Sequence, residues 1–384
     1  MKVSVLQENL AKGLSIVGRA VATKSTLPVL GNILLSTDKS RLKLSATNLE
    51  IGINCWVGAK NEDQGAITVP ARLLSEYVSN LPNDRIDMEL TLRTHTLNLN
   101  CARVKTNIKG IDAEEFPLIP VVTDLPTLVI SPNLLKEMIA QVAFAAATEE
   151  SRPVLAGVLA SFDGAAGTFT LAAADGFRLS VRSAALPNNA SGKLDVIIPA
   201  RTLLEVARIL SSIDTANDGE VEVTVTPNKS QVLFHMNDVD VVSRLIEGQF
   251  PNYQQIVPKS TKTKTLLNTA DFLRSTRRAS IFARDSANVI RLAILPGDEG
   301  APGHLTISAT AAEIGDNEED VDAIVEGEPV NVAFNARYLA DVLGVLSTTQ
   351  VTLETSSPDS PGVIKPAGPD IQFTHVIMPM HVTR

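Results

Sequence analysis

Three stretches of the chain share one pattern of hydrophobic and polar positions. They read VPARLLSEYVSNL from Val69, IPARTLLEVARIL from Ile198 and FNARYLADVLGVL from Phe334. In each stretch an arginine follows the apolar start, and apolar residues then recur at the spacing of an amphipathic helix. A run that alternates polar and apolar residues comes next, IDMELTLR, EVEVTVT or QVTLET, and this alternation predicts a strand.

A second predicted helix occurs earlier in each copy. The segments are LQENLAKGLSIVGRAV from Leu6, SPNLLKEMIAQVAFAA from Ser131 and TADFLRSTRRASIFA from Thr269. Short apolar runs joined by turn residues follow each of them, and they predict hairpins. The repeated unit is therefore helix, strands, helix, strands, about 125 to 135 residues long.

This repeat predicts an α+β protein of three similar domains in tandem, covering residues 1–122, 128–255 and 259–384. The segments EEFPLIPVVTDLP (114–126) and EGQFPNYQQIVPKS (247–260) separate the copies, and their prolines favour extended linkers. Three modules with separate binding tasks are the alternative, but such arrays usually have loose, polar linkers. Because these linkers are short and apolar, we expect the domains to pack rigidly.

The composition is that of a soluble globular protein, with 44% hydrophobic and 20% charged residues. No apolar run reaches the roughly 18 residues of a membrane span, and the N-terminus lacks a signal-peptide pattern. The two cysteines, Cys55 and Cys101, form no metal-ligand pattern, so we expect buried thiols in a reducing compartment. These features predict a cytoplasmic protein without a membrane partner.

Motifs of catalysis are missing. The sequence contains no Walker loop, dinucleotide fingerprint, nucleophile elbow or HExxH pair, and its five histidines are scattered. Asp175-Gly176 could belong to a phosphate or metal loop, but a turn that ends a strand is the favoured interpretation. The acidic run DNEEDVD (316–322) could bind a cation, but it lacks the EF-hand positions and favours a solvated loop. We expect no active site, no metal and no cofactor.

The charges are segregated along the chain, although the net charge is −9. The six predicted helices carry eleven basic and six acidic residues, a balance of +5, which leaves −14 for the rest of the chain. Basic helices on an acidic body suit a surface that binds DNA. The alternative is that lysine and arginine simply favour exposed helix faces.

Geometry narrows the choice. Six helices about 10 Å in diameter, placed side by side in a ring, leave a hole of only about 9 Å, which is too narrow for duplex DNA. Twelve helices from two chains leave a hole of about 28 Å, which admits a duplex and water. Because a repeated unit closes a ring through heterologous contacts, the sequence predicts a head-to-tail homodimer.

Several motifs in order resemble the β sliding clamp family of bacterial DNA polymerase III, over essentially the full length. They are TLPVLGN (26–32), VPAR (69–72), GIDAEEFP (110–117), RPVLAGV (152–158), AADGFRL (173–179), FPNYQQIVP (250–258), FNARYL (334–339) and VIMPM (376–380). The resemblance implies the DNA clamp fold, with two chains in a closed ring, helices inside and sheets outside. It implies a non-enzymatic processivity factor of DNA replication that encircles duplex DNA without sequence preference.

The resemblance also implies a hydrophobic cleft between the second and third domains. There, short linear motifs of the polymerase III catalytic subunit, the clamp loader, other polymerases and repair proteins would bind. Carried across motif by motif, its walls are Leu155, Ala174, Gly176, Phe177, Arg178, Leu179, Pro251, Ile256, Asn335, Tyr338, Val376, Met378 and Pro379. We expect Arg178 and Asn335 to bond a peptide backbone; alternatively, the apolar members are inter-domain core. Phe177 and His381 depart from the family pattern, which has a histidine and a basic residue there.

Two further surfaces complete the prediction. The residues expected to contact DNA are basic ones, mostly on the repeated helices: Lys24, Arg72, Arg152, Arg201, Arg208, Arg277 and Arg278. The dimer interface is expected to join the first-domain strand VKTNIKG to an apolar pair of the third domain, through Val104, Thr106, Ile108, Ile281 and Phe282.

Two alternatives from other classes stay open on the sequence. A nuclease or polymerase-like enzyme would need clustered carboxylates for two metal ions, whereas the helices carry only isolated acids. A three-domain scaffold without a DNA role would show no salt-dependent DNA affinity.

Overall fold

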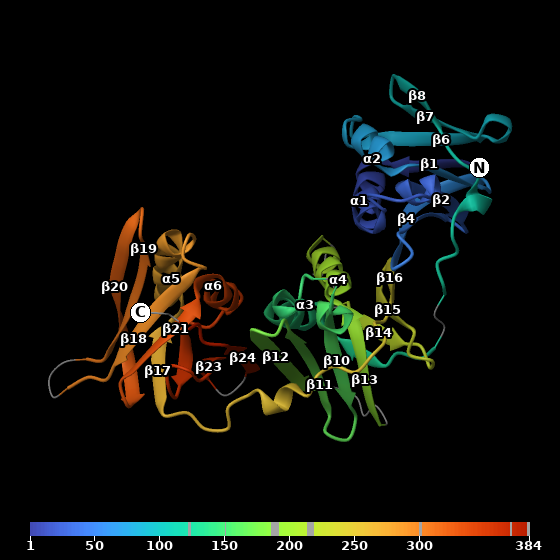
Figure 1. Cartoon of the computed structure of the whole chain (residues 1–384). Helices are drawn as coiled ribbons and strands as arrows, with labels where there is room; N and C mark the ends of the chain where they lie inside the picture. The colour runs from blue at the N-terminus through green and yellow to red at the C-terminus, as the bar shows by residue number, and fades with distance from the viewer. Residues whose placement is uncertain are drawn as a thin grey trace. The chain divides into compact units, whose positions relative to one another are not determined.

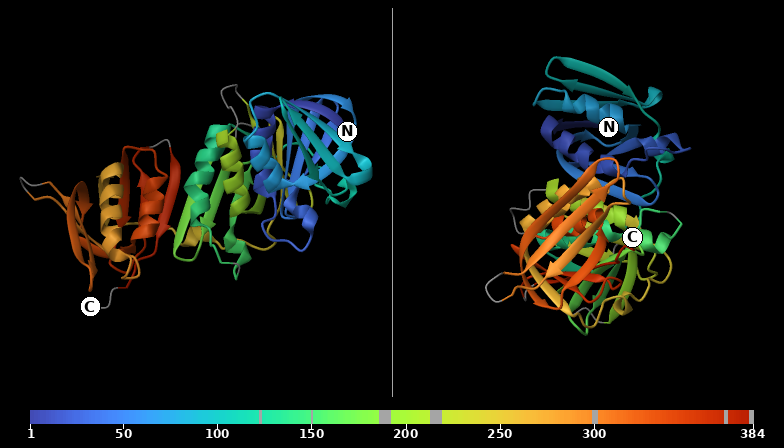
Figure 2. Two further views of the ribbon diagram at one scale, coloured as in Figure 1. Left: turned by 90° about the horizontal axis from the view of Figure 1, so that it is seen from above. Right: turned by 60° about the vertical axis from the view of Figure 1, so that its left-hand side comes forward.

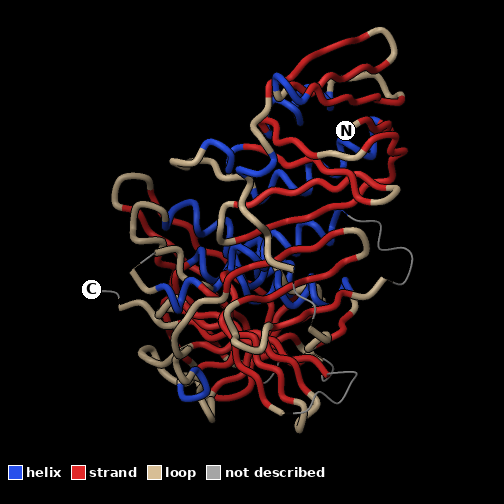
Figure 3. Tube along the Cα trace, turned by 90° about the vertical axis from the view of Figure 1, so that its right-hand side faces the viewer, coloured by secondary structure: helices blue, strands red, loops and turns tan. Residues whose placement is uncertain are grey.

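One order of elements occurs three times in the computed structural model, which describes residues 1–121, 124–149, 151–185, 192–212, 219–298, 302–368 and 371–381. Each repeat has a strand, a helix, four strands, a second helix and three strands. Strands dominate the secondary structure (Figure 3). The predicted order of helix, strands, helix, strands is confirmed.

The first repeat has helices α1 (Gln7–Val17) and α2 (Ala71–Ser79) and strands β1 (Lys2–Leu6), β2 (Asn32–Asp38), β3 (Arg41–Thr47), β4 (Ile51–Asp63), β5 (Ala66–Pro70), β6 (Arg85–Thr91), β7 (Thr96–Cys101) and β8 (Val104–Lys109). The second has α3 (Pro132–Val142), α4 (Ala200–Ser212), β9 (Leu128–Ile130), β10 (Gly157–Asp163), β11 (Thr168–Ala174), β12 (Arg178–Ala185), β13 (Lys193–Pro199), β14 (Val221–Val225), β15 (Gln231–Met236) and β16 (Val239–Arg244). The third has α5 (Thr269–Ala283), α6 (Ala336–Gly344), β17 (Thr263–Asn268), β18 (Val289–Leu295), β19 (His304–Ala311), β20 (Gly315–Gly327), β21 (Val330–Asn335), β22 (Gln350–Thr355), β23 (Gly362–Pro366) and β24 (Gln372–Ile377).

The strand that opens each repeat was missed by the sequence analysis. These strands, β1, β9 and β17, end no more than one residue before the following helix, so the alternating pattern of the strand merges with the helical pattern. Two predicted helices were also too long: α1 ends at Val17 and α3 ends at Val142, and a 3-10 turn follows each.

Two compact units make up the fold, and each contains one 12-stranded sheet. The first unit comprises Met1–Lys136 and Glu205–Leu245. Its sheet has the order β8-β7-β6-β1-β4-β16-β15-β14-β9, and β2, β3 and β5 extend from β4. The strand β16 of the second repeat is thus an antiparallel neighbour of β4 of the first, with Val239 opposite Cys55.

The second unit comprises Glu137–Leu204 and Ile246–Arg384. Its sheet has the order β13-β10-β11-β12-β24-β23-β22-β17-β20-β19-β18-β21. Helices α5 and α6 lie side by side (Figures 1 and 2) and bury Phe272 and Leu339 in a core that also contains Phe334. Here β24 of the third repeat pairs with β12 of the second, as β16 does with β4.

The acidic run 316–322 is not a loop, so this prediction was wrong. It forms the first half of β20, which is hydrogen-bonded to β19. Backbone pairing does not depend on side-chain polarity, and alternation directs Glu318, Asp320 and Asp322 to solvent. The opposite face carries Glu319, whose side chain is mostly buried.

The two linkers differ in how they pack. In the second, Phe250, Tyr253 and Val257 pack on a buried cluster. In the first, Leu118 and Leu125 are 96% and 90% exposed, whereas Phe116 is buried. The predicted domain boundary at residue 122, like the last three residues of the chain, lies outside the described residues.

Candidate functional site

The predicted cleft lies where β12 ends its pairing with β24. Leu179 is opposite Val376, and Arg178 is opposite Ile377. Beyond the last pair, the Met378 amide donates to the Phe177 carbonyl oxygen over 2.8 Å. This hydrogen bond places the Gly176 turn of the second repeat beside the Met-Pro-Met segment of the third.

The segment Asp175-Gly176-Phe177 is a tight turn between β11 and β12, which confirms the predicted turn. Gly176 has a φ of +95°, a conformation that side chains with a Cβ adopt at a cost. The Asp175 Oδ1 atom accepts hydrogen bonds from the amides of Phe177 (2.9 Å) and Arg178 (3.0 Å). The turn presents Phe177 to solvent with 61% of its surface exposed.

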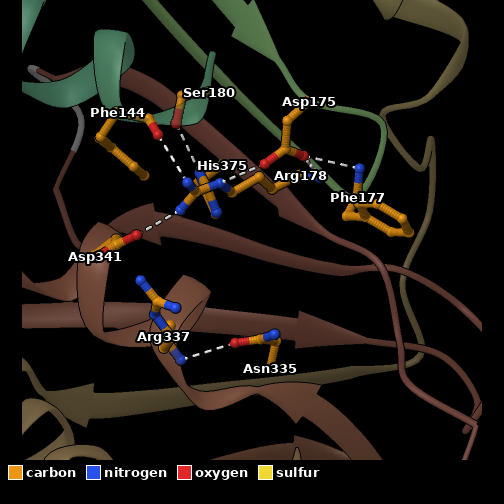
Figure 4. Close-up of polar contacts among 9 residues, drawn as sticks. All are labelled: Phe144, Asp175, Phe177, Arg178, Ser180, Asn335, Arg337, Asp341 and His375. Atoms are coloured by element: carbon orange, nitrogen blue, oxygen red, sulfur yellow. Dashed lines mark hydrogen bonds and ion pairs between the residues drawn. The ribbon is translucent and has the colours of Figure 1, made fainter. Parts of the chain in front are cut away.

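Arg178 is the centre of the polar contacts at this joint (Figure 4). Its Nε donates to Asp175 (2.9 Å), one terminal nitrogen to Asp341 (2.6 Å) and the other to the Phe144 carbonyl oxygen (2.8 Å). Its guanidinium lies 5.2 Å from the centre of the Phe144 ring and 4.4 Å from that of Tyr338. Only 10% of the side chain is exposed.

All three guanidinium nitrogens of Arg178 therefore have partners within the chain. The expectation that Arg178 bonds a peptide backbone remains a prediction, but the geometry assigns it a different task. It connects the 3-10 turn Ala143–Ala145 to the Gly176 turn and to helix α6, and these last two elements carry predicted cleft residues. Its partners Phe144 and Asp341 are far away in sequence, so spacing could not reveal them.

His375 lies under this cluster and is fully buried. Its Nδ1 is 2.7 Å from the Ser180 hydroxyl, and its ring stacks on Phe144 at 5.6 Å. Burial, with a smaller contribution from the Arg178 charge, lowers the pKa of His375 to about 3. The imidazole is therefore neutral at physiological pH and acts as a packing and hydrogen-bonding group.

The apolar floor of the site consists of Ala174, Leu179, Val363 and Val376, all buried. Three of these were predicted cleft residues, and the structure brings them together. Phe250, Tyr253 and Val257 pack against them but were missed as site residues, although the motif FPNYQQIVP contains all three.

The other predicted cleft residues vary in exposure. Ile256 and Met378 are 41% and 38% exposed. Pro251 is exposed, whereas Leu155 and Pro379 are half-buried. The side-chain oxygen of Asn335 accepts from the Arg337 amide (2.9 Å) and so caps α6, and its amide nitrogen is available to donate to a ligand.

The predicted DNA-binding residues are all exposed, but they divide into two groups. Arg208 is paired with Glu205 at 2.5 Å, and Glu205 also contacts Arg19. Arg278 is paired with Glu319, with Nε to Oε2 at 2.8 Å. The hydrogen bond from Arg278 lowers the pKa of Glu319.

The second group keeps its charge uncompensated. Within the described part of the chain, five of the predicted residues have no acidic partner: Lys24, Arg72, Arg152, Arg201 and Arg277. A surface cation without an internal partner can neutralise a phosphate at less cost than one that must first leave a carboxylate. We therefore expect these five residues to contribute more to DNA binding than Arg208 and Arg278.

Two strand edges lie open near the predicted dimer interface. The edge strand β8 exposes Val104 and Asn107, whereas Ile108 is buried in its own repeat. In the third repeat, β17 pairs with β20 only over Ala323–Gly327, so the Gly315–Asp322 half pairs with β19 alone. On α5, Ile281 is 53% exposed, and Phe282 packs partly on its own core.

Within the described ranges, no group of three or more histidine, cysteine, aspartate or glutamate side chains is arranged to hold a metal ion. No helix there has the length and apolar character needed to traverse a bilayer.

Comparison with known proteins identifies the family. The N-terminal, central and C-terminal domain models of the DNA polymerase III beta subunit match residues 1–120, 129–252 and 254–381. The beta sliding clamp of Synechococcus elongatus is 33% identical over 390 residues, with both chains fully covered. That of Bacillus subtilis is 29% identical, with 99% of each chain covered.

Solved structures agree with the sequence matches. The Bacillus subtilis DNA polymerase sliding clamp superimposes with a TM-score of 0.92 at 28% identity, and the DNA polymerase III subunit beta of Pseudomonas aeruginosa with 0.88 at 30%, both with full coverage of the two chains. The three repeats are thus three clamp domains in tandem, and the predicted α+β fold class is confirmed. The chain belongs to the DNA polymerase III beta subunit family, the non-catalytic bacterial sliding clamps.

Proposed function

We propose that this chain is a DNA sliding clamp. Two copies would form a closed ring that encircles duplex DNA and tethers polymerases to it without catalysing a reaction. The full-length match to beta sliding clamps carries this proposal. The proposed site of action is the cytoplasm, at the nucleoid, because chromosomal DNA lies there.

The pairing of equivalent strands supports ring closure. Within the chain, the last strand of one repeat pairs with the long strand of the repeat before it, β16 with β4 and β24 with β12. The last strand of the first repeat, β8, and the long strand of the third, β20, lack this neighbour in the described residues. A second copy placed head to tail provides it twice, once at each of two interfaces.

The internal joints also give the register of the proposed interface. Val239 is opposite Cys55, and Phe373 is opposite Arg182. The equivalent residues put Val104 opposite Glu319 of a second copy and Lys105 opposite Glu318. Basic β8, with Lys105 and Lys109, would thus pair with the acidic half of β20.

Reversing charges at this interface tests the ring. Lys105→Glu and Glu318→Lys each place like charges opposite one another, and each should raise the dimer dissociation constant about three- to tenfold. The double variant restores opposite charges at both interfaces and should dimerise like the parent chain in sedimentation velocity. Parent-like dimers from both single variants would contradict the proposed register, and a monomeric parent chain would contradict the ring.

The arginines and lysines without internal partners would attract the phosphates of any duplex. Such contacts carry no sequence information, so the clamp would slide without sequence preference. Retention would come from the closed ring, and the contacts would centre the DNA within it.

The cleft would bind short linear motifs of the polymerase III catalytic subunit, the clamp loader and repair proteins. The predicted cleft residues Phe177, Ile256 and Met378 are exposed, and Leu179 and Val376 belong to one buried apolar cluster. An apolar segment with a few backbone hydrogen bonds fits this chemistry. Replacing Met378 by glutamate should therefore weaken binding of such a peptide without dissociating the dimer.

A further inference from the structure

The third repeat has an open cavity of about 580 Å³ beside the cleft. We name it the outer trough, and the residues that define it are Arg291, Ser308, Asn331, Ala333, Met380 and His381. They come from neighbouring strands β18, β19 and β21 and from the segment that follows β24. None belongs to the predicted cleft.

Strand register identifies the equivalent positions in the other two repeats. In each repeat, the second strand (β2, β10 or β18) lies between two neighbouring strands. One residue of each of these three strands forms a row across the sheet, with the residue of the second strand in the centre. The three rows are Ser45-Leu34-Thr68, Ala172-Leu159-Ile197 and Ser308-Arg291-Ala333. The centre of the row is leucine in the first two repeats and arginine in the third.

In the first two repeats, the linker that follows the last strand covers the flanking residues of this row, and the central leucine is half-buried. Ile111 forms a bridge with Thr68, which is 0% exposed, and Ser45 is 3% exposed. Ile246 forms the equivalent bridge with Ile197, which is 4% exposed. The row is therefore a place where this fold accommodates an extended segment.

Among the described residues, the third repeat begins the same arrangement but covers only one residue of the row, Ala333, which is 7% exposed. The Met380 amide donates to the Ala333 carbonyl oxygen over 2.8 Å, as the Ile246 amide does to Ile197. Ser308 is nevertheless only half-buried, and the central Arg291 is exposed.

The change from leucine to arginine indicates what the trough would bind. No hydrogen bond or ion pair of the Arg291 side chain occurs among the described residues. Asp359 also lines the trough, but its contact is with His381, at 3.5 Å, and it forms no ion pair with Arg291. The linkers that cover the other rows have an acidic residue directly after the bridging isoleucine, Asp112 or Glu247.

The trough is continuous with the cleft along two paths. Asn335 of the cleft is two residues from Ala333 on β21, so both side chains leave the same face of the sheet. Met380 is two residues from the cleft residue Met378. A chain bound in the cleft can therefore extend into the trough without turning back.

We propose that the outer trough is a second docking subsite, which binds an acidic extended segment next to the motif that occupies the cleft. A carboxylate of that segment would pair with Arg291, and its backbone would lie along β21. This proposal rests on the proposed cleft, and it adds a preference for partners whose docking motif is flanked by glutamate or aspartate.

The test compares labelled peptides by fluorescence anisotropy with the full-length chain. The probes are a docking peptide from a bacterial polymerase, the same peptide extended by three glutamates at either end, and matched peptides extended by three glutamines. One glutamate form should bind about three- to fivefold more tightly than its glutamine counterpart. Arg291→Ala should abolish this difference and leave the affinity of the unextended peptide unchanged, whereas Arg93→Ala, an exposed arginine in the first repeat, should change neither.

Other outcomes would overturn the proposal in distinguishable ways. If the unextended peptide binds and the glutamate extension gains nothing, the trough is wrong and the cleft stands. If no form binds, the proposed cleft fails as well. If Arg291→Glu dissociates the dimer, a second copy covers the trough, and the assignment to a partner peptide is wrong.

Discussion

Removing Arg178 should selectively destabilise the joint between the second and third repeats. Arg178→Ala leaves the Asp175 carboxylate, whose side chain is 13% exposed, without its guanidinium partner. It also leaves the Phe144 carbonyl oxygen without its donor. Breaking a buried ion pair costs about 3 to 5 kcal/mol, but Asp175 retains two backbone donors, so we expect about 3 kcal/mol.

Hydrogen exchange followed by mass spectrometry measures this effect where it should occur. The amides of β24, which pair with β12, should exchange about 100-fold faster in Arg178→Ala, the factor that corresponds to about 3 kcal/mol. Arg178→Lys retains the charge but cannot make the three hydrogen bonds in the same geometry, so its β24 amides should exchange at a rate between those of the parent chain and Arg178→Ala.

The chain supplies two controls. Its single tryptophan, Trp56, lies in β4 of the other unit, so its fluorescence should report unchanged unfolding of the first repeat. Arg337→Ala removes an exposed arginine of α6 and should leave the exchange of β24 unchanged. Parent-like exchange of β24 in Arg178→Ala would refute the assignment of Arg178 as the group that holds the joint.

Three further predictions follow from the site. Arg277→Ala should lower DNA affinity and reduce the slope of log affinity against log salt by up to about 1, whereas Arg278→Ala should lower both by less. Glu319→Gln should raise DNA affinity because it releases Arg278. Equal effects of the two arginine variants in salt titrations would contradict the view that the unpaired arginine contributes more to DNA binding. Gly176→Ala should destabilise the second unit by about 1 kcal/mol or more in denaturant unfolding because Gly176 has a φ of +95°. Gly58→Ala is the control, because Gly58 lies on a strand and a Cβ there would meet open space. Equal stability of the two variants would refute the argument from backbone strain. Because the pKa of His375 is lowered to about 3, the contribution of this residue to stability is complete above the unfolded pKa near 6.5 and is lost as pH falls towards 3. Below pH 6.5 the stability of the parent chain should therefore fall more steeply than that of His375→Phe, by up to about 1.4 kcal/mol per pH unit. Parallel stability profiles of the two chains against pH would contradict burial of a neutral imidazole.

The repeated architecture could be predicted from sequence because each repeat carries its own pattern. The VPAR, IPAR and FNAR segments begin helices α2, α4 and α6 next to the end of a strand, as their shared spacing indicated. The helix predicted from Thr269 is α5 with the same bounds. The short opening strands escaped because three to six residues give little periodicity before the helix begins.

The site could be predicted only in part. Leu179 and Val376 were recognised through family motifs, and the structure pairs them across β12 and β24. The task of Arg178 depends on Asp341, which is 163 residues away, and no spacing rule connects the two. The pairing of Arg278 with Glu319 was hidden because Glu319 was assigned to a loop instead of β20.

Retention on circular DNA tests the central claim most directly. The protein is loaded onto a nicked circular plasmid by a bacterial clamp loader with ATP, half of the sample is linearised, and both halves are gel-filtered in high salt, which weakens phosphate contacts. A topological clamp should stay with the circles and leave the linear DNA through its ends. Equal retention on circles and linear DNA would show ordinary binding and contradict the ring.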